Sequence, residues 1–204
     1  MAFTNYTAFV TVVKNYLART DLDSVIPDFI ELAQERLSRD LRVQEMLKVA
    51  TASTTSGDAT IAFPTDFLQL RDLHIQGNPV YQLEFQTPDK FFRNQLTHTS
   101  GIPKYFTLLA SEFQFAPTPD SSRTVQMLYY AKPDFIDTST ASNLYLAYFP
   151  DALLYATLAE AEPYLMNDER VAVWGSLYDR ALANIKANDK GATFSGASLN
   201  VTTR

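Results

Sequence analysis

The side chains best suited to acid–base chemistry are sparse in this 204-residue chain. It contains two histidines, His74 and His98, and no cysteine, so its sequence excludes disulfides, thiolate metal ligands and a cysteine nucleophile. A zinc site built on both histidines would need carboxylates to complete four ligands. His74 falls in an alternating apolar segment and His98 in Thr97–Ser100, so we interpret them as a strand residue and a loop residue.

Paired carboxylates are the next candidates for chemistry. Glu160 and Glu162 lie two positions apart in a predicted helix and therefore point to different faces. Asp168 and Glu169 open another predicted helix, where acids offset the helix dipole. A carboxylate hydrolase would need a deep pocket holding two close acids with separated pKa values. We interpret these four residues as helix caps and solvated side chains.

Aromatic pairs could form stacking platforms for sugars or bases. We interpret Tyr129–Tyr130 and Phe91–Phe92 instead as alternating between core and surface, and Trp174 as a core residue on an apolar helix stripe. The six glycines are scattered singly and form no phosphate-binding loop, and no GxSxG nucleophile elbow occurs. The sequence therefore predicts no catalytic site, no metal and no cofactor.

The charge balance points away from nucleic-acid recognition. The chain has 17 basic and 23 acidic residues, a net charge of −6, and no third of it forms a basic arm. Its apolar runs are too short for a membrane span, and Met1–Asn5 lacks the features of a signal peptide. We therefore expect no membrane partner and synthesis in a reducing cytoplasm.

Helical periodicity marks both ends of the chain. Apolar residues recur at three- and four-residue steps over Asn5–Ala18 and from Ile26 to about Met46, with Asp21–Ser24 offering caps for the second helix. A short helix over Ser142–Phe149 and another from Pro150 to Pro163 are predicted near the other end. A long helix follows, capped by Asn167–Glu169, running to about Asn188 and stopped by Gly191.

Strand patterns and turn residues fill the middle of the chain. We predict strands at Ala59–Phe63 and Lys104–Leu109, and a hairpin that joins Leu68–Ile75 to Val80–Phe85 through Gly77–Pro79. Thr87-Pro88-Asp89 is a helix opener. Two further strands are predicted at Phe113–Ala116 and Val125–Lys132, and we assign no strand to the small, hydroxyl-rich stretch Thr51–Thr55.

These elements predict an α+β fold. Residues 1–46 and 136–190 would form a discontinuous α-helical bundle body, and 47–135 an inserted small antiparallel β domain. Residues 191–204 would form a flexible, extended C-terminal tail, because they hold few large apolar groups. Such a tail typically becomes ordered on a partner, so the pattern indicates a component of a larger assembly.

The succession of motifs resembles the head-to-tail adaptor, or connector, proteins of tailed bacteriophages, especially short-tailed ones. The resemblance covers nearly the whole chain. It is carried by Ile26–Arg42, Phe63–Leu68, Gly101–Phe106, Phe113–Pro117, Leu128–Tyr130, Pro150–Tyr155, Asn167–Arg170, Trp174 and Ala181–Leu182.

The resemblance implies a structural virion protein without catalytic activity, located at the head–tail junction. Such adaptors form a ring, typically of twelve copies, beneath the portal protein, carry tail or nozzle proteins and help line the channel through which DNA passes. Their C-terminal segment commonly grips the portal, which assigns portal docking here to Phe194, Leu199, Val201 and Arg204. The alternative is a β-rich ligand- or carbohydrate-binding module of a virion tail component, using residues 47–135.

Overall fold

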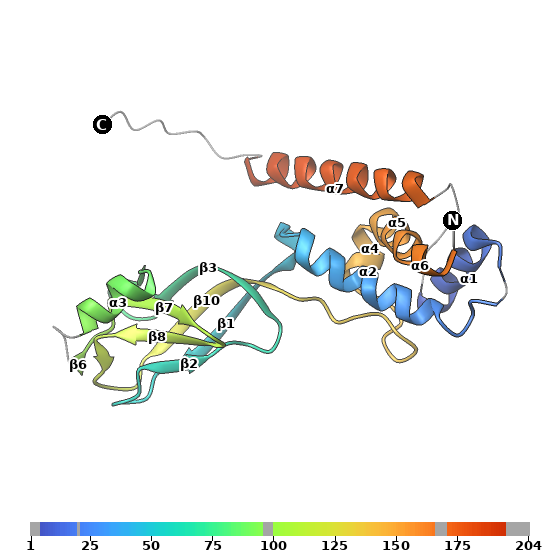
Figure 1. Cartoon of the computed structure of the whole chain (residues 1–204). Coiled ribbons are helices and arrows are strands. Elements are labelled where there is room, and N and C mark those ends of the chain that lie inside the picture. Colours follow the sequence, from blue (N-terminus) through green and yellow to red (C-terminus); the bar gives the residue numbers. More distant parts are fainter. Residues whose placement is uncertain (1–4, 20, 96–99, 166–170, 195–204) are drawn as a thin grey trace. The chain divides into compact units, whose positions relative to one another are not determined.

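The chain consists of a helical unit and a β unit. The computed structural model in Figure 1 describes residues 5–19, 21–95, 100–165 and 171–194. The helical unit comprises residues 1–46 and 133–204, and the β unit comprises residues 47–132. Helices and antiparallel strands are thus largely segregated along the chain, and the predicted α+β class is confirmed.

The helical unit is built on α5, whose apolar surface is covered on more than one side. Its side chains from Ala152 to Leu154 and from Ala156 to Leu158 are all buried, since α2 and α7 both pack against it. A helix that is apolar all round requires such a central position. The helices of this unit are α1 (Tyr6–Leu17), α2 (Ile26–Asp40), α4 (Leu144–Tyr148), α5 (Pro150–Glu160), α6 (Glu162–Leu165) and α7 (Val171–Phe194).

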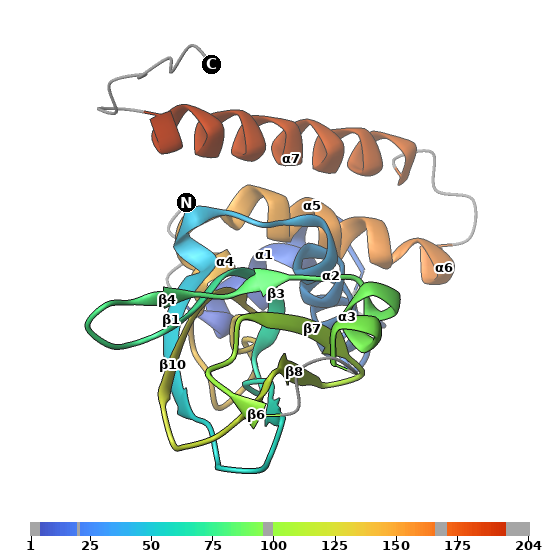
Figure 2. The same cartoon turned by 90° about the vertical axis from the view of Figure 1, so that its left-hand side faces the viewer.

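Two of the predicted stripes form the core beside α5. Phe29, Ala33 and Leu37 of α2 are buried as the periodicity predicts, and so are Trp174 and Tyr178 of α7. Figure 2 shows α7 running alongside α5. The predicted apolar faces therefore identify the contact surfaces of these helices correctly.

Helix α2 begins at Ile26 as predicted, but the predicted caps and the predicted end near Met46 are wrong. No side chain from Asp21–Ser24 caps the helix: Val25 is the N-cap, and Ile26 N donates to Leu22 O in a preceding turn. The helix ends at Asp40 because Leu41 is extended, with ψ 137°, and a 3-10 turn follows at Gln44–Met46. Arg42 donates to the carbonyl oxygen of Ser38, which satisfies one of the last helical acceptors.

The predicted end of the last helix is also wrong. Helix α7 continues through Gly191 and ends at Phe194. A glycine in a helix costs about 1 kcal/mol relative to alanine, but it does not end the helix unless the backbone turns there. The predicted cap at Asn167–Glu169 lies outside the described residues.

A buried glutamine and an arginine fasten separate segments of the helical unit. Gln34, fully buried, accepts from Ile136 N at 2.8 Å and from Asn143 Nδ2 at 2.9 Å, and its amide donates to Ile136 O at 3.4 Å. The Arg36 guanidinium lies 3.1 Å from Glu160 of α5 and 4.4 Å from the ring centroid of Tyr178 in α7. These contacts connect α2 to α5, to α7 and to the segment that precedes α4.

The β unit contains two four-stranded sheets and a small two-stranded one. In the first sheet the order is β1-β10-β3-β4, in the second it is β2-β8-β7-β5, and β6 pairs with β9. Helix α3 (Pro88–Gln95) packs on β7 and β8. The strands are β1 (Leu47–Ser53), β2 (Thr60–Ala62), β3 (Phe67–Ile75), β4 (Tyr81–Gln82), β5 (Glu84–Phe85), β6 (Ser100–Gly101), β7 (Tyr105–Leu109), β8 (Glu112–Ala116), β9 (Thr118–Pro119) and β10 (Thr124–Ala131).

Two features of the β unit differ from the prediction. The segment interpreted as non-strand around Thr51 belongs to β1, which pairs with β10 from Leu47↔Tyr130 to Ser53↔Thr124. The predicted hairpin partner Val80–Phe85 is divided: β4 pairs antiparallel with β3, whereas β5 pairs parallel with β7 in the other sheet. Leu83, between them, is buried.

An aromatic cluster and one ionic contact stabilise the β unit. Phe63 stacks on Phe67 with ring centroids 4.4 Å apart, and both rings make edge contacts with buried Phe113. Asp66 accepts hydrogen bonds from Lys48 at 2.6 Å and Tyr129 Oη at 2.8 Å. Burial raises the pKa of Tyr129 to about 12, and its hydrogen bond to Asp66 adds to this effect.

Candidate assembly surfaces

The residues predicted to dock on a portal lie at and beyond the end of α7. Phe194 is the last residue of that helix. Leu199, Val201 and Arg204 lie outside the described residues. The surfaces that the structure does describe are a cleft beside α7 and a groove in the β unit.

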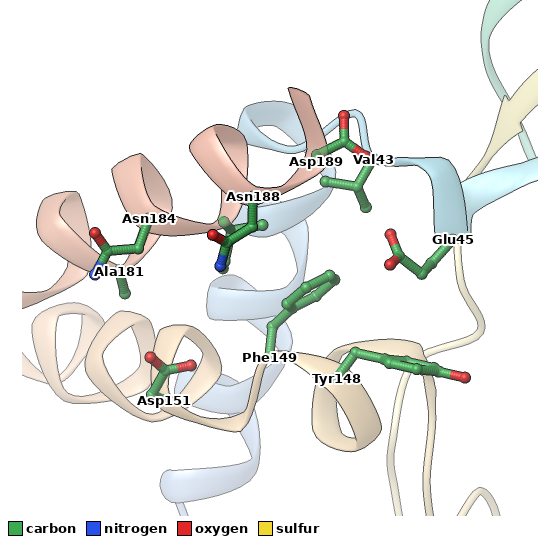
Figure 3. A pocket seen from close by; sticks show the side chains of 10 residues that line it. Val43, Glu45, Tyr148, Phe149, Asp151, Ala181, Asn184, Asn188 and Asp189 are labelled. Carbon is green, nitrogen blue, oxygen red and sulfur yellow. The ribbon is translucent and has the colours of Figure 1, made fainter. Parts of the chain in front are cut away.

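The cleft lies between the C-terminal half of α7, the α4–α5 corner and the segment after α2. It encloses about 320 Å³, and Figure 3 shows Phe149 pointing from the corner toward α7. Residues distant in sequence bring three carboxylates to its lining, those of Glu45, Asp151 and Asp189. Asp189 Oδ1 also accepts from Gln44 N at 2.8 Å, which ties the end of α7 to the 3-10 turn.

The chemistry of this cleft favours cations and hydrogen-bond donors. Its lining includes two amides, Asn184 and Asn188, and none of the residues that line it is basic. Tyr148, at its rim, is 65% exposed and offers an apolar ring with a polar tip. Phosphate or DNA would meet three carboxylates and no basic side chain in this lining, so the cleft disfavours anionic ligands.

The groove of the β unit, called here the β3–β7 groove, is mainly apolar. It encloses about 360 Å³ and is lined by Phe67 to Arg71 of β3 together with Phe85, Phe106 and Leu108. Phe85 is 53% exposed, and its ring makes an edge contact with the ring of Phe106, with centroids 5.6 Å apart. Phe106 in turn contacts buried Phe113, so the exposed ring of the groove is connected to the core of the β unit. Exposed apolar area of this kind is typical of a docking surface.

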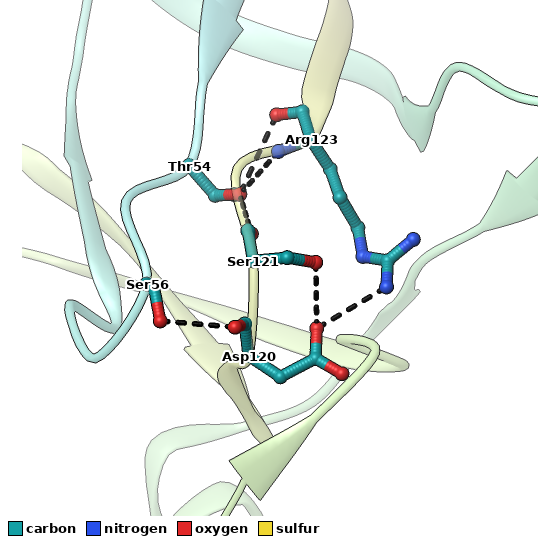
Figure 4. Close-up of polar contacts among 5 residues, drawn as sticks. All are labelled: Thr54, Ser56, Asp120, Ser121 and Arg123. Atoms are coloured by element: carbon teal, nitrogen blue, oxygen red, sulfur yellow. Dashed lines mark hydrogen bonds and ion pairs between the residues drawn. The ribbon is translucent and has the colours of Figure 1, made fainter.

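Figure 4 shows a third cluster, in which hydroxyls surround Asp120. Ser121 Oγ and Arg123 Nη2 donate to Asp120 Oδ1 at 2.9 and 3.2 Å, and these bonds lower the pKa of that carboxyl. Thr54 Oγ1 accepts from Arg123 N at 2.9 Å, and Ser56 Oγ donates to Asp120 O at 2.9 Å. Each of these hydroxyls thus holds a backbone or carboxylate group, so the cluster ties the β1–β2 loop to the segment before β10.

Those sequence candidates for chemistry that the structure describes are not assembled into a reactive site. His74 lies in β3 with Nδ1 3.0 Å from Asp72 Oδ2, and within the described part of the chain no serine or threonine hydroxyl bonds to it. Glu160 forms the ion pair with Arg36, and Glu162 begins α6. His98, Asp168 and Glu169 lie outside the described residues.

The aromatic pairs alternate between core and surface as interpreted. Tyr129 and Phe91 are buried, Tyr130 is half-buried and Phe92 is 44% exposed. Trp174 is buried, as predicted. The exposed aromatics of the groove lie among apolar neighbours with few polar groups, an arrangement that does not favour the carbohydrate-binding alternative.

Sequence reasoning missed Gln34 and both surfaces. Gln34 lies four positions after Ile30 and three before Leu37, on the apolar stripe of α2. A polar residue on such a stripe is the sequence signal that would have identified it as buried. The cleft has no such signal, because Glu45, Asp151 and Asp189 come from three separate segments.

Among the residues placed by the structure, no helix is long and apolar enough to cross a membrane, and no three histidine or carboxylate side chains are grouped to hold a metal ion.

A comparison with curated proteins gives no match. A comparison with protein-family models matches the SU10 adaptor protein over residues 4–202. The match spans nearly the entire sequence, and the chain therefore belongs to this family of phage adaptor proteins.

Proposed function

We propose that this phage adaptor is a head-to-tail connector that forms a ring, typically of twelve copies, beneath the portal protein. The observation that carries this proposal is the family match over residues 4–202, since it covers the helical unit, the β unit and most of the predicted tail. In this role the helical unit is a bundle body, the β unit is its inserted domain, and the ring presents a platform for tail or nozzle proteins. The protein acts by its shape and contacts and not by catalysis.

The charge of the chain supports passage of DNA without retention. A channel that releases the genome should not bind phosphates tightly, and a net charge of −6 with a carboxylate-lined cleft satisfies that condition.

Residues 191–204 are proposed to contact the portal through Phe194, Leu199, Val201 and Arg204. The apolar side chains would fill portal clefts, and Arg204 would pair with a carboxylate. Each contact is weak, but a ring multiplies them by avidity. Residues 191–194 are the last turn of helix α7, so this helix sets where the proposed contact segment begins. The hydrogen bond of Asp189 and the Arg36–Tyr178 contact hold the helix on the rest of the helical unit.

Co-sedimentation with purified portal rings tests this proposal. The full-length chain should sediment with portal, and a chain truncated after Lys190 should not. Replacing Leu199 and Val201 by serine retains the tail length and serves as the matched variant, with binding expected to weaken strongly. Equal sedimentation of all three chains would remove the tail from the mechanism.

A further inference from the structure

The β unit carries an apolar protrusion in addition to the β3–β7 groove. The loop between β3 and β4 extends from the sheet (Figure 2). Val80 at its end is 61% exposed, and Tyr81, the first residue of β4, is 39% exposed. No charged residue occurs from Gln76 to Gln82. We call residues 76–82 the β3–β4 tip.

The tip and the groove lie at opposite ends of one strand. Strand β4 pairs only with His74 and Ile75, so the tip extends beyond the C-terminal end of β3, whereas the groove follows Phe67 to Arg71 at its beginning. At about 3.3 Å per residue, the four steps from Arg71, the last groove residue of β3, to Ile75, which pairs with Tyr81, span about 13 Å. The tip of one copy is therefore placed to reach the groove of another copy and not its own.

We propose that the β3–β4 tip of one copy docks into the β3–β7 groove of the next copy. This inference rests on the proposed ring and assigns one of its contacts. A contact between two different patches leaves a free tip on one copy and a free groove on the other, and repetition closes a ring when the rotation permits. A ring of one protein needs such a head-to-tail contact, which a symmetric dimer patch does not provide.

The chemistry of the two surfaces is complementary. The groove has one charged side chain, Arg71, and the tip has none, so docking brings no like charges together and buries no carboxylate of the tip. Val80 and Tyr81 would enter beside Phe85 and Leu108, which are themselves exposed in the single chain. Arg71 Nη1 lies 3.5 Å from Tyr130 Oη, a long hydrogen bond, which leaves guanidinium donors for the carbonyl oxygens of an incoming tip.

The absence of cysteine from the chain permits a direct test. Full-length Val80→Cys and Leu108→Cys proteins are mixed at concentrations where sedimentation velocity shows association, and a short bismaleimide is added. We expect a cross-linked dimer that requires both variants. Mixing Val80→Cys with Thr55→Cys, an exposed position elsewhere in the β unit, is the matched control and should give no such dimer.

A charge exchange provides the second measurement. Val80→Glu and Leu108→Lys should each abolish association alone, and an equal mixture of the two should restore it, because a glutamate tip then meets a lysine groove. Association without the 80–108 cross-link, or without rescue in the mixture, would overturn the tip–groove contact and leave the ring proposal standing. A chain that stays monomeric at every concentration, and also with portal rings present, would overturn both.

Discussion

Replacing Gln34 with methionine tests the hydrogen bonds that fasten the segment before α4 to α2. Methionine has nearly the length and volume of glutamine, so the side-chain stem still fills its buried position. The change removes the acceptor of Ile136 N at 2.8 Å and the weaker donor to Ile136 O at 3.4 Å. Ile136 is itself buried, so water cannot replace either partner without local opening.

The expected loss follows from the groups left unpaired. A buried N–H or C=O without a partner costs about 1–3 kcal/mol, and the long bond to the carbonyl contributes at the lower end. Asn143 Nδ2 also loses its bond to Gln34 but retains the one to Asp134 O, so this amide keeps a hydrogen-bond partner. Gln34→Met should therefore reduce the free energy of unfolding of the helical unit by about 2–4 kcal/mol.

Trp174 makes this measurement specific. It is the single tryptophan of the chain and is buried in the helical unit, so its fluorescence in urea follows that unit alone. Hydrogen exchange at the Ile136 amide should accelerate in the same variant. Glu31→Met, at an exposed position of the same helix, should change stability by less than about 0.5 kcal/mol. A loss equally small for Gln34→Met, with Ile136 still protected, would refute the reasoning.

Three further predictions concern single side chains. Thr107→Val should stabilise the β unit by about 1 kcal/mol in calorimetry, because the fully buried Thr107 hydroxyl has no hydrogen-bond partner among the described residues; destabilisation would show that it has one. Burial alone would raise the pKa of Asp66, but the hydrogen bonds from Lys48 and Tyr129 outweigh it and lower this pKa overall. The ionised carboxylate therefore stabilises the fold at pH values above its unfolded pKa of about 4. This stabilisation is lost as the pH falls through the folded pKa of Asp66. Asp66→Asn should accordingly lower Tm at pH 7 and match the parent chain at the acidic end of a titration, and a constant difference would contradict this. Tyr178→Phe should cost about 1.5–3 kcal/mol in the Trp174-detected transition, because it removes the 2.7 Å bond to the Asp40 carboxylate; an unchanged midpoint would argue against that bond.

The sequence predicted those elements whose local signals agree with their tertiary contacts. Asn5 Oδ1 accepts from Ala8 N at the start of α1, and Thr87-Pro88 precedes α3 as expected. The stripe of α2 is buried because the same periodicity that predicts the helix also defines its packing face. At the starts of α1 and α3 and along α2, the conformation that the local sequence favours is also the one that the tertiary contacts stabilise.

The errors arise where distant residues decide the structure. Strand β1 is formed by pairing with β10 more than 70 positions away, and its two alanines carry little strand propensity of their own. Helix α7 passes Gly191 although a local rule places a stop there. The assembly surfaces depend on three-dimensional neighbours, as the union of Asp151 and Asp189 in one cleft shows.

Electron microscopy of portal rings mixed with the full-length chain tests the central claim most directly. The account predicts a second ring of density, coaxial with the portal and beneath it, that appears only when the chain is added. Portal rings that remain unchanged at saturating concentrations of the folded chain would contradict it.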